Sequence, residues 1–291
     1  MSKVAIAASP ISRMELPIFF VVVGAIISGA VALVAATGDE NFALIGVVLL
    51  GPSVTAVLLT ALTIGRTGLR QLVIKQMTLL FGVQWYLSAF LAVPMIALVA
   101  IGLHTVFGGP DPQFFRSSLF PQIVFILVIS LAEEFGWRGY ALPRLQVRLN
   151  ALQASLVLGV LWGFWHFPGF LIGAGVPLDM PFYVFMMWVL PVTILVTWVY
   201  NNSRSVVTAI AMHTSANFAF GFFPLIPEMT GTGELATFWV FLGVVWAAAI
   251  AVVIVFGPTH LSRTKPRATI APRTDAMAQG STDKLAGTIA A

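Results

Sequence analysis

The sequence predicts an all-α fold, an integral membrane bundle of about eight transmembrane helices with a disordered cytoplasmic C-terminal tail. Of its 291 residues, 59% are hydrophobic and only 9% are charged, whereas a soluble domain carries about a quarter charged residues. The apolar residues gather in runs long enough to cross a hydrocarbon core of about 30 Å. The chain has no cysteine, which excludes disulfides, cysteine nucleophiles and cysteine metal sites.

Eight apolar runs follow one another along the chain. After the second run, Arg66, Arg70 and Lys75 alternate with apolar residues, a pattern typical of an interfacial amphipathic helix. From residue 259 the chain turns polar and rich in small residues, which predicts a disordered tail over 259–291. The runs cover residues 16–36, 42–64, 83–103 (starting as early as 79), 119–132, 152–172, 182–200, 206–225 and 236–256.

The basic residues give the bundle an orientation. If the amino terminus, residues 1–15, is cytoplasmic, the inside segments hold nearly all Lys and Arg, and the outside segments hold only Arg116. This asymmetry predicts a multi-pass protein of the cell membrane with both termini in the cytoplasm, and it supports the count of eight. Because the positive charge lies in short loops, the lipid bilayer and not nucleic acid is the expected partner.

The fourth run ends in an ionisable cluster, Glu133-Glu134-Phe135-Gly136-Trp137-Arg138. Charged side chains are costly within a membrane, so such a cluster indicates function by default. On a helix, Glu134 and Arg138 are four residues apart and share a face. We therefore expect Arg138 to hold Glu134, which leaves Glu133 free to handle protons.

Three further polar residues lie within spans: His166, His213 and Asn217. His213 and Asn217 share a helix face, and residue counts place both near mid-membrane with Glu133, with His166 a few residues nearer the outer side. Each residue has a structural alternative, since a single histidine or asparagine in a span often makes only a packing or interhelical hydrogen bond. Their occurrence together in three spans favours one shared cavity.

This set of side chains suits hydrolysis of an acyl group by water. A glutamate beside a histidine can deprotonate and orient a water molecule, and a histidine and an amide on one face can stabilise an oxyanion. Alternatively, Glu133, His166 and His213 are possible ligands of a divalent metal such as zinc, with an open position for water. The spacing does not match H-E-x-x-H, and no serine lies in a G-x-S-x-G context.

The three motifs resemble those of the CAAX-processing and bacteriocin-processing (CPBP, or Abi) intramembrane endopeptidases. The family motifs E-E-x-x-x-R, F-x-x-x-H and H-x-x-x-N correspond in order to residues 133–138, 162–166 and 213–217, with Trp162 in place of phenylalanine. We expect that change to alter packing more than chemistry. The resemblance covers roughly residues 119–225.

The resemblance implies a role for each matching residue. It implies that Glu133 and His166 activate water, that His213 and Asn217 stabilise the oxyanion, and that Glu134 and Arg138 orient the site. The family is commonly classed as metalloproteases, and a metal-free glutamate mechanism is also argued for it. Its eukaryotic members trim prenylated C-a-a-X proteins, but nothing in this sequence indicates a prenylated substrate.

The resulting division of the chain has five parts: an N-terminus (1–15), helices one to three (16–118), a catalytic core (119–225), an eighth helix (226–258) and the tail (259–291). The expected partner is a peptide or membrane-protein substrate. Two other functions stay open: a non-proteolytic immunity or scaffold protein, and a proton-coupled transporter that uses Glu and His as a relay. The lack of an internal repeat argues against the transporter.

Overall fold

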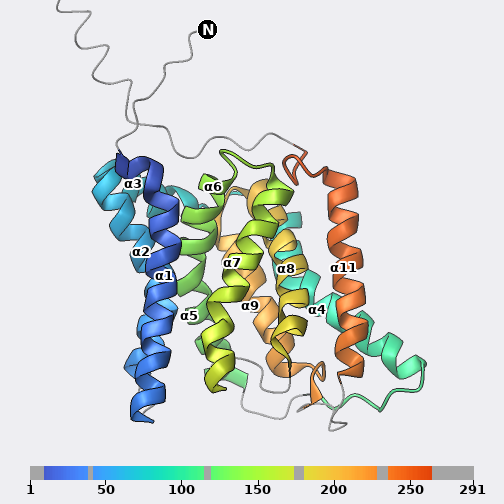
Figure 1. Cartoon of the computed structure of the whole chain (residues 1–291). Coiled ribbons are helices and arrows are strands. Elements are labelled where there is room, and N and C mark those ends of the chain that lie inside the picture. Colours follow the sequence, from blue (N-terminus) through green and yellow to red (C-terminus); the bar gives the residue numbers. More distant parts are fainter. Residues whose placement is uncertain (1–9, 39–41, 115–118, 174–179, 228–234, 264–291) are drawn as a thin grey trace, which may run out of the picture.

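The computed structural model describes residues 10–38, 42–114, 119–173, 180–227 and 235–263. Within these ranges the secondary structure is helical and includes no strand. The helices stand side by side as a bundle (Figure 1), so the predicted all-α membrane fold is confirmed. The predicted N-terminus up to residue 9 and the predicted tail from residue 264 lie outside the described ranges.

All eight predicted apolar runs form helices, but of two lengths. Six are long and apolar enough to cross a membrane. The other two, α5 (Leu119–Glu134) and α9 (Val206–Phe222), have only 16 and 17 residues. The six long helices are α1 (Pro10–Thr37), α2 (Phe42–Thr63), α4 (Val83–Val106), α7 (Ala151–Ile172), α8 (Phe182–Ser203) and α11 (Ala236–Phe256).

The predicted interfacial segment is a chain of short helical turns. It consists of α3 (Arg66–Leu69), the π-helix η1 (Arg70–Ile74) and the 3₁₀-helix η2 (Lys75–Met77). Leu72 is buried while Arg66, Arg70 and Ile74 are exposed. The segment therefore presents both basic and apolar side chains outward, as expected at a membrane surface.

Helix α5 does not stop at its two glutamates. It continues as the π-helix η3 (Phe135–Ala141) and then as α6 (Leu142–Leu145). The helical segment ends at Leu145. All residues from Gly136 to Ala141 are buried. A π-helical segment inside an α-helix is uncommon and often marks a functional site.

Glycine at position 136 allows η3 to approach α2 closely. A Cβ atom built there would lie 2.5 Å from the carbonyl carbon of Pro52 and 2.6 Å from its oxygen. Those atoms belong to the backbone of α2, which cannot move aside as a flexible side chain can. The close packing of Gly136 against Pro52 therefore restricts how η3 can be positioned along α2.

Helix α9 occupies the middle of the bundle, between α4, α5 and α8 (Figure 1). Each of its residues is buried or half-buried. Ser205 caps its start by accepting a hydrogen bond from the Val207 backbone N–H. A helix enclosed in this way can carry polar side chains because protein, not lipid, surrounds it.

Gln76 ties the interfacial segment to η3 and α8. Its Nε2 donates to the Gly139 carbonyl oxygen at 2.9 Å, and its Oε1 accepts from the Tyr200 hydroxyl at 2.9 Å. Ser205 Oγ donates to the carbonyl oxygens of Gln76 and Thr78. The amide side chain thus satisfies buried polar groups on two elements at once.

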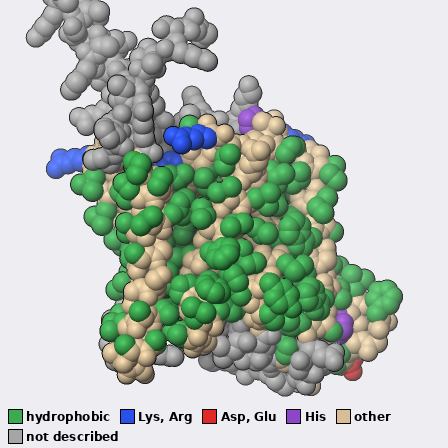
Figure 2. Space-filling model, in the orientation of Figure 1, with side chains coloured by type: hydrophobic (Ala, Val, Ile, Leu, Met, Phe, Trp, Pro, Cys, Tyr) green, Lys and Arg blue, Asp and Glu red, His purple; other side chains and the backbone are tan. Residues whose placement is uncertain are grey.

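The flank of the bundle seen in Figure 2 is covered by hydrophobic side chains, and Lys and Arg gather at the end that carries α3 and α6. Exposed apolar side chains include Val21, Leu58, Leu91 and Ile254. A contiguous apolar band with basic residues at one end is the surface of a multi-pass membrane protein.

Candidate active site

Glu134 is the anchor of the ionisable cluster. Its Oε1 accepts hydrogen bonds from Arg138 Nη1 at 2.6 Å and from His213 Nδ1 at 2.9 Å. The side chains of Glu134 and Arg138 are fully buried. The predicted pairing of these two residues is therefore confirmed, and it extends to α9 through His213.

Glu133 lies in a different environment from its neighbour. It is 2% exposed, and its Oε2 accepts hydrogen bonds from Trp137 Nε1 at 3.2 Å and Trp162 Nε1 at 3.0 Å. Its Oε1 has no hydrogen-bond partner among the described residues. The expectation that Glu133 is free therefore holds for one oxygen only, since two indole N–H groups engage the other.

His166 is oriented by the backbone of its own helix. Its Nδ1 lies 2.8 Å from the Trp162 carbonyl oxygen, four residues earlier in α7. Because a carbonyl oxygen can only accept, Nδ1 carries the hydrogen and Nε2 of the neutral ring is left as an acceptor. The ring is half-buried and packs against Trp165 and Phe185.

Trp162 joins these groups. Besides its bond to Glu133, its ring makes edge contacts with His166 and His213, with centroids 5.6 Å and 5.3 Å apart. The Arg138 guanidinium carbon lies 4.7 Å from its ring centroid, within the range of a cation–π contact. Tryptophan at this position therefore adds a hydrogen bond to Glu133 that phenylalanine could not make, besides its packing contacts. That the change affects packing more than chemistry stays a prediction.

Asn217 is the predicted site residue that makes no such contact. It lies one turn after His213 on α9 and is half-buried. Within the described residues its side chain has no hydrogen bond to the other groups. The structure therefore gathers Glu133, Glu134, Arg138, His166 and His213 into one cluster around Trp162, with Asn217 one turn away.

The three residues that are possible metal ligands by sequence do not come together as one ligand group in this arrangement. The described residues contain no group of three His, Cys, Asp or Glu side chains that could hold one metal ion. The hydrogen bonds do not themselves prevent metal binding, because they engage Oε2 of Glu133 and Nδ1 of His213 and leave Oε1 and Nε2 without a partner among the described residues. As placed, Glu133, His166 and His213 do not form such a group.

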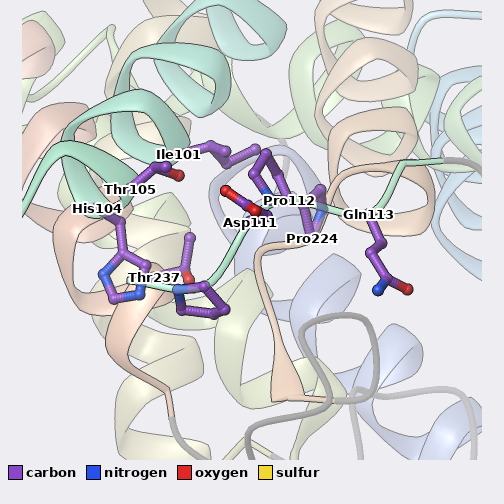
Figure 3. Close-up of a pocket in the computed structure, with 9 residues that line it drawn as sticks. Ile101, His104, Thr105, Asp111, Pro112, Gln113, Pro224 and Thr237 are labelled. Carbon is purple, nitrogen blue, oxygen red and sulfur yellow. The ribbon is translucent and has the colours of Figure 1, made fainter. Parts of the chain in front are cut away.

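A small pocket lies elsewhere in the bundle, where α4 ends (Figure 3). It is lined by residues that include His104, Thr105, Asp111, Pro224 and Thr237. None of the predicted site residues lines it. His104 therefore lies apart from the ionisable cluster.

Sequence reasoning missed the two indole donors. Trp137 lies four residues after Glu133, the same spacing that identified the Glu134–Arg138 pair. A buried tryptophan N–H usually finds a hydrogen-bond acceptor, so this spacing was the available signal. The bond from Trp162 crosses between helices and had no comparable signal in the sequence.

Comparisons with known proteins agree with the motifs. Residues 115–219 match the family model described as Type II CAAX prenyl endopeptidase Rce1-like. CAAX prenyl protease 2 from Methanococcus maripaludis is 32% identical over 142 residues, which are 44% of this chain and 52% of that protein. The match thus spans about half the length of the curated relative. The segment 115–219, which contains the three ordered motifs, is therefore similar to the Rce1-like CAAX prenyl endopeptidases, and this similarity supports the resemblance to the CPBP family.

Proposed function

We propose that this protein is an intramembrane endopeptidase that hydrolyses a peptide bond of a membrane-associated protein or peptide. One observation carries the proposal: Glu133, His166 and His213, from three separate helices, meet around Trp162 inside the bundle. The family match supports the same reaction class. We further propose that both termini are cytoplasmic, as the distribution of basic residues predicts.

In the proposed first step, Glu133 and His166 activate water. Oε1 of Glu133 accepts a proton from the water molecule, and Nε2 of His166 accepts a hydrogen bond from its other O–H group. The bond from His166 Nδ1 to the Trp162 carbonyl supports this role, because it leaves Nε2 as the acceptor. The water oxygen then attacks the scissile carbonyl carbon.

The attack places a negative charge on the former carbonyl oxygen. We propose that Asn217 Nδ2 and His213 Nε2 donate to this oxyanion. His213 can donate from both nitrogens only when its ring is doubly protonated, and the Glu134 carboxylate at Nδ1 then serves as its counter-ion. Arg138 fixes that carboxylate in turn. Preorganised donors of this kind are each worth about 2.7–4 kcal/mol in acyl transfer.

Collapse of the tetrahedral intermediate breaks the C–N bond. The proton that Glu133 took from water passes to the departing nitrogen, which regenerates the Glu133 carboxylate. The products are a neutral carboxylic acid and a neutral amine. One residue thus serves first as general base and then as general acid.

The test is cleavage of peptides by the purified full chain in lipid nanodiscs. The probes are a farnesylated C-a-a-X peptide, the same peptide without the lipid, and an acylated peptide of unrelated sequence. Wild type is compared with Glu133→Gln, and with Glu15→Gln as a matched control, because Glu15 is another buried glutamate that pairs with Arg144. Each assay is run with and without a chelator.

We expect Glu133→Gln to lower kcat about 10²–10⁴-fold, the usual contribution of a general base, and Glu15→Gln to cleave like wild type. Loss of cleavage on chelation, restored by an added divalent ion, would replace the metal-free scheme with a metal-dependent one. Equal cleavage by wild type and Glu133→Gln would overturn the proposed role of Glu133. No cleavage of any probe, together with a cellular phenotype that survives Glu133→Gln, would favour a scaffold.

A further inference from the structure

The two adjacent glutamates are held in different ways. Glu134 faces a full positive charge, the guanidinium of Arg138, whereas Glu133 faces two neutral indole N–H groups. Trp137 belongs to η3 and Trp162 to α7, so donors from two elements converge on one oxygen. Two donors of fixed position restrain rotation of the carboxylate better than one.

An indole N–H suits this task because it donates and never accepts. It can bind Oε2 without taking the proton that a general base must carry. It also adds no charge, so Glu133 is oriented but not neutralised by a counter-ion. A hydrogen bond to an ionised acceptor is about twice as strong as one between neutral groups.

Both rings are fixed by their own packing. Trp137 is 1% exposed and makes edge contacts with Phe19 of α1 and with Trp165. Trp162 is 6% exposed and lies against the Arg138 guanidinium. Neither ring can turn without displacing neighbours, so the position of each N–H is set before any substrate binds.

From this geometry we infer that Trp137 and Trp162 act together as positioning residues, which hold Glu133 through Oε2 so that Oε1 is presented to the reacting water. The inference rests on the proposed endopeptidase function for its kinetic consequence. The pair of hydrogen bonds itself does not depend on that function.

The kinetic test replaces each indole with a phenyl ring. Trp162→Phe and Trp137→Phe keep an aromatic ring and remove the N–H. Trp165→Phe is the matched control, because Trp165 lies on the same helix as Trp162, is equally exposed at 6%, and has an indole nitrogen without a hydrogen-bond partner. We expect Trp162→Phe to lower kcat about 10- to 100-fold with little change in KM, since small errors in position are costly in catalysis. Trp165→Phe should lower it far less.

The spectroscopic test needs no activity. The protein is labelled with ¹⁵N-tryptophan, and indole ¹H–¹⁵N resonances, assigned with the single phenylalanine variants, are compared between wild type and Glu133→Gln. A neutral amide oxygen is a weaker acceptor than a carboxylate, so the Trp137 and Trp162 signals should move upfield. The signal of Trp198, whose indole nitrogen is buried without a partner, should stay in place.

The two tests separate the possible failures. If the chemical shifts of the Trp137 and Trp162 indoles are the same in wild type and Glu133→Gln, the two hydrogen bonds to Glu133 do not exist. This conclusion holds whether or not the protein cleaves peptides. If the signals respond but Trp162→Phe and Trp165→Phe reduce kcat equally, the positioning role is overturned. If the signals respond and neither wild type nor any variant cleaves a probe, the endopeptidase proposal fails, and the positioning role of Trp137 and Trp162 in catalysis fails with it.

Discussion

His213 Nδ1 lies 2.9 Å from Glu134 Oε1, and this single contact joins α9 to the end of α5 across 79 residues of sequence. The same oxygen holds Arg138. The carboxylate therefore supports a histidine on one side and balances a buried cation on the other. Its removal should affect folding as well as chemistry.

Glu134→Gln is expected to destabilise the fold by about 3–5 kcal/mol, because it leaves the fully buried Arg138 without a counter-charge. The measurement is the free energy of unfolding in detergent micelles. Glu15→Gln is the control: its ion pair with Arg144 is 10–12% exposed, so the loss should be smaller, about 1 kcal/mol. Equal losses in the two variants would contradict a special role for the buried pair.

Gly136→Ala is expected to destabilise the fold by about 1–3 kcal/mol, the usual cost of overpacking, because the added methyl group meets the Pro52 backbone at 2.5 Å. Displacement of η3 should also reduce any cleavage. Gly102→Ala in α4 is the control, since nothing lies within 4 Å of its Cβ position. That variant should be neutral or up to about 1 kcal/mol more stable. A thermal midpoint of Gly136→Ala at or above wild type would show that η3 can move away from α2.

Asn217→Ala is expected to reduce kcat about 10²–10³-fold, as loss of one oxyanion donor does. Stability should change by less than about 1 kcal/mol, because the Asn217 side chain makes no hydrogen bond to a described residue. Thr214→Val, on the same helix, removes a buried hydroxyl that also lacks a partner and should cleave like wild type. The proposed role of Asn217 fails if its loss lowers the thermal midpoint and leaves kcat intact.

Gln76→Leu is expected to cost about 1–3 kcal/mol for each buried group left unpaired, namely the Gly139 carbonyl and the Tyr200 hydroxyl. Tyr200→Phe alone should cost less than Gln76→Leu. The double variant should cost less than the sum of the two, because the second change removes the hydroxyl that the first left unpaired. Additive losses in a double-mutant cycle would show that Gln76 and Tyr200 act independently.

The sequence predicted the helices well because hydropathy reports burial in lipid directly. The run 182–200 became α8 with ends at Phe182 and Ser203, and the run 236–256 became α11 without change. It could not predict that η3 is a π-helix. That register depends on contacts such as the approach of Gly136 to Pro52, which lies 84 residues earlier in the chain.

The candidate site was predictable to the extent that its contacts are local. The pairing of Glu134 with Arg138 follows from a spacing of four residues. The bond from Trp162 to Glu133 spans 29 residues, and the bond from Tyr200 to Gln76 spans 124. Such contacts depend on which helices lie side by side, and the pattern of apolar residues in the sequence does not predict that arrangement.

The enclosure of α9 has a consequence for the membrane itself. Its 17 residues extend about 25 Å at 1.5 Å per residue, less than the hydrocarbon core. Lipid-facing helices must match that thickness by tilting or by deforming the bilayer, but α9 has no exposed residue and is under no such requirement. Changes in acyl-chain length therefore act on the outer helices first, and His213 keeps its depth relative to Glu134 while the bilayer adjusts around the bundle.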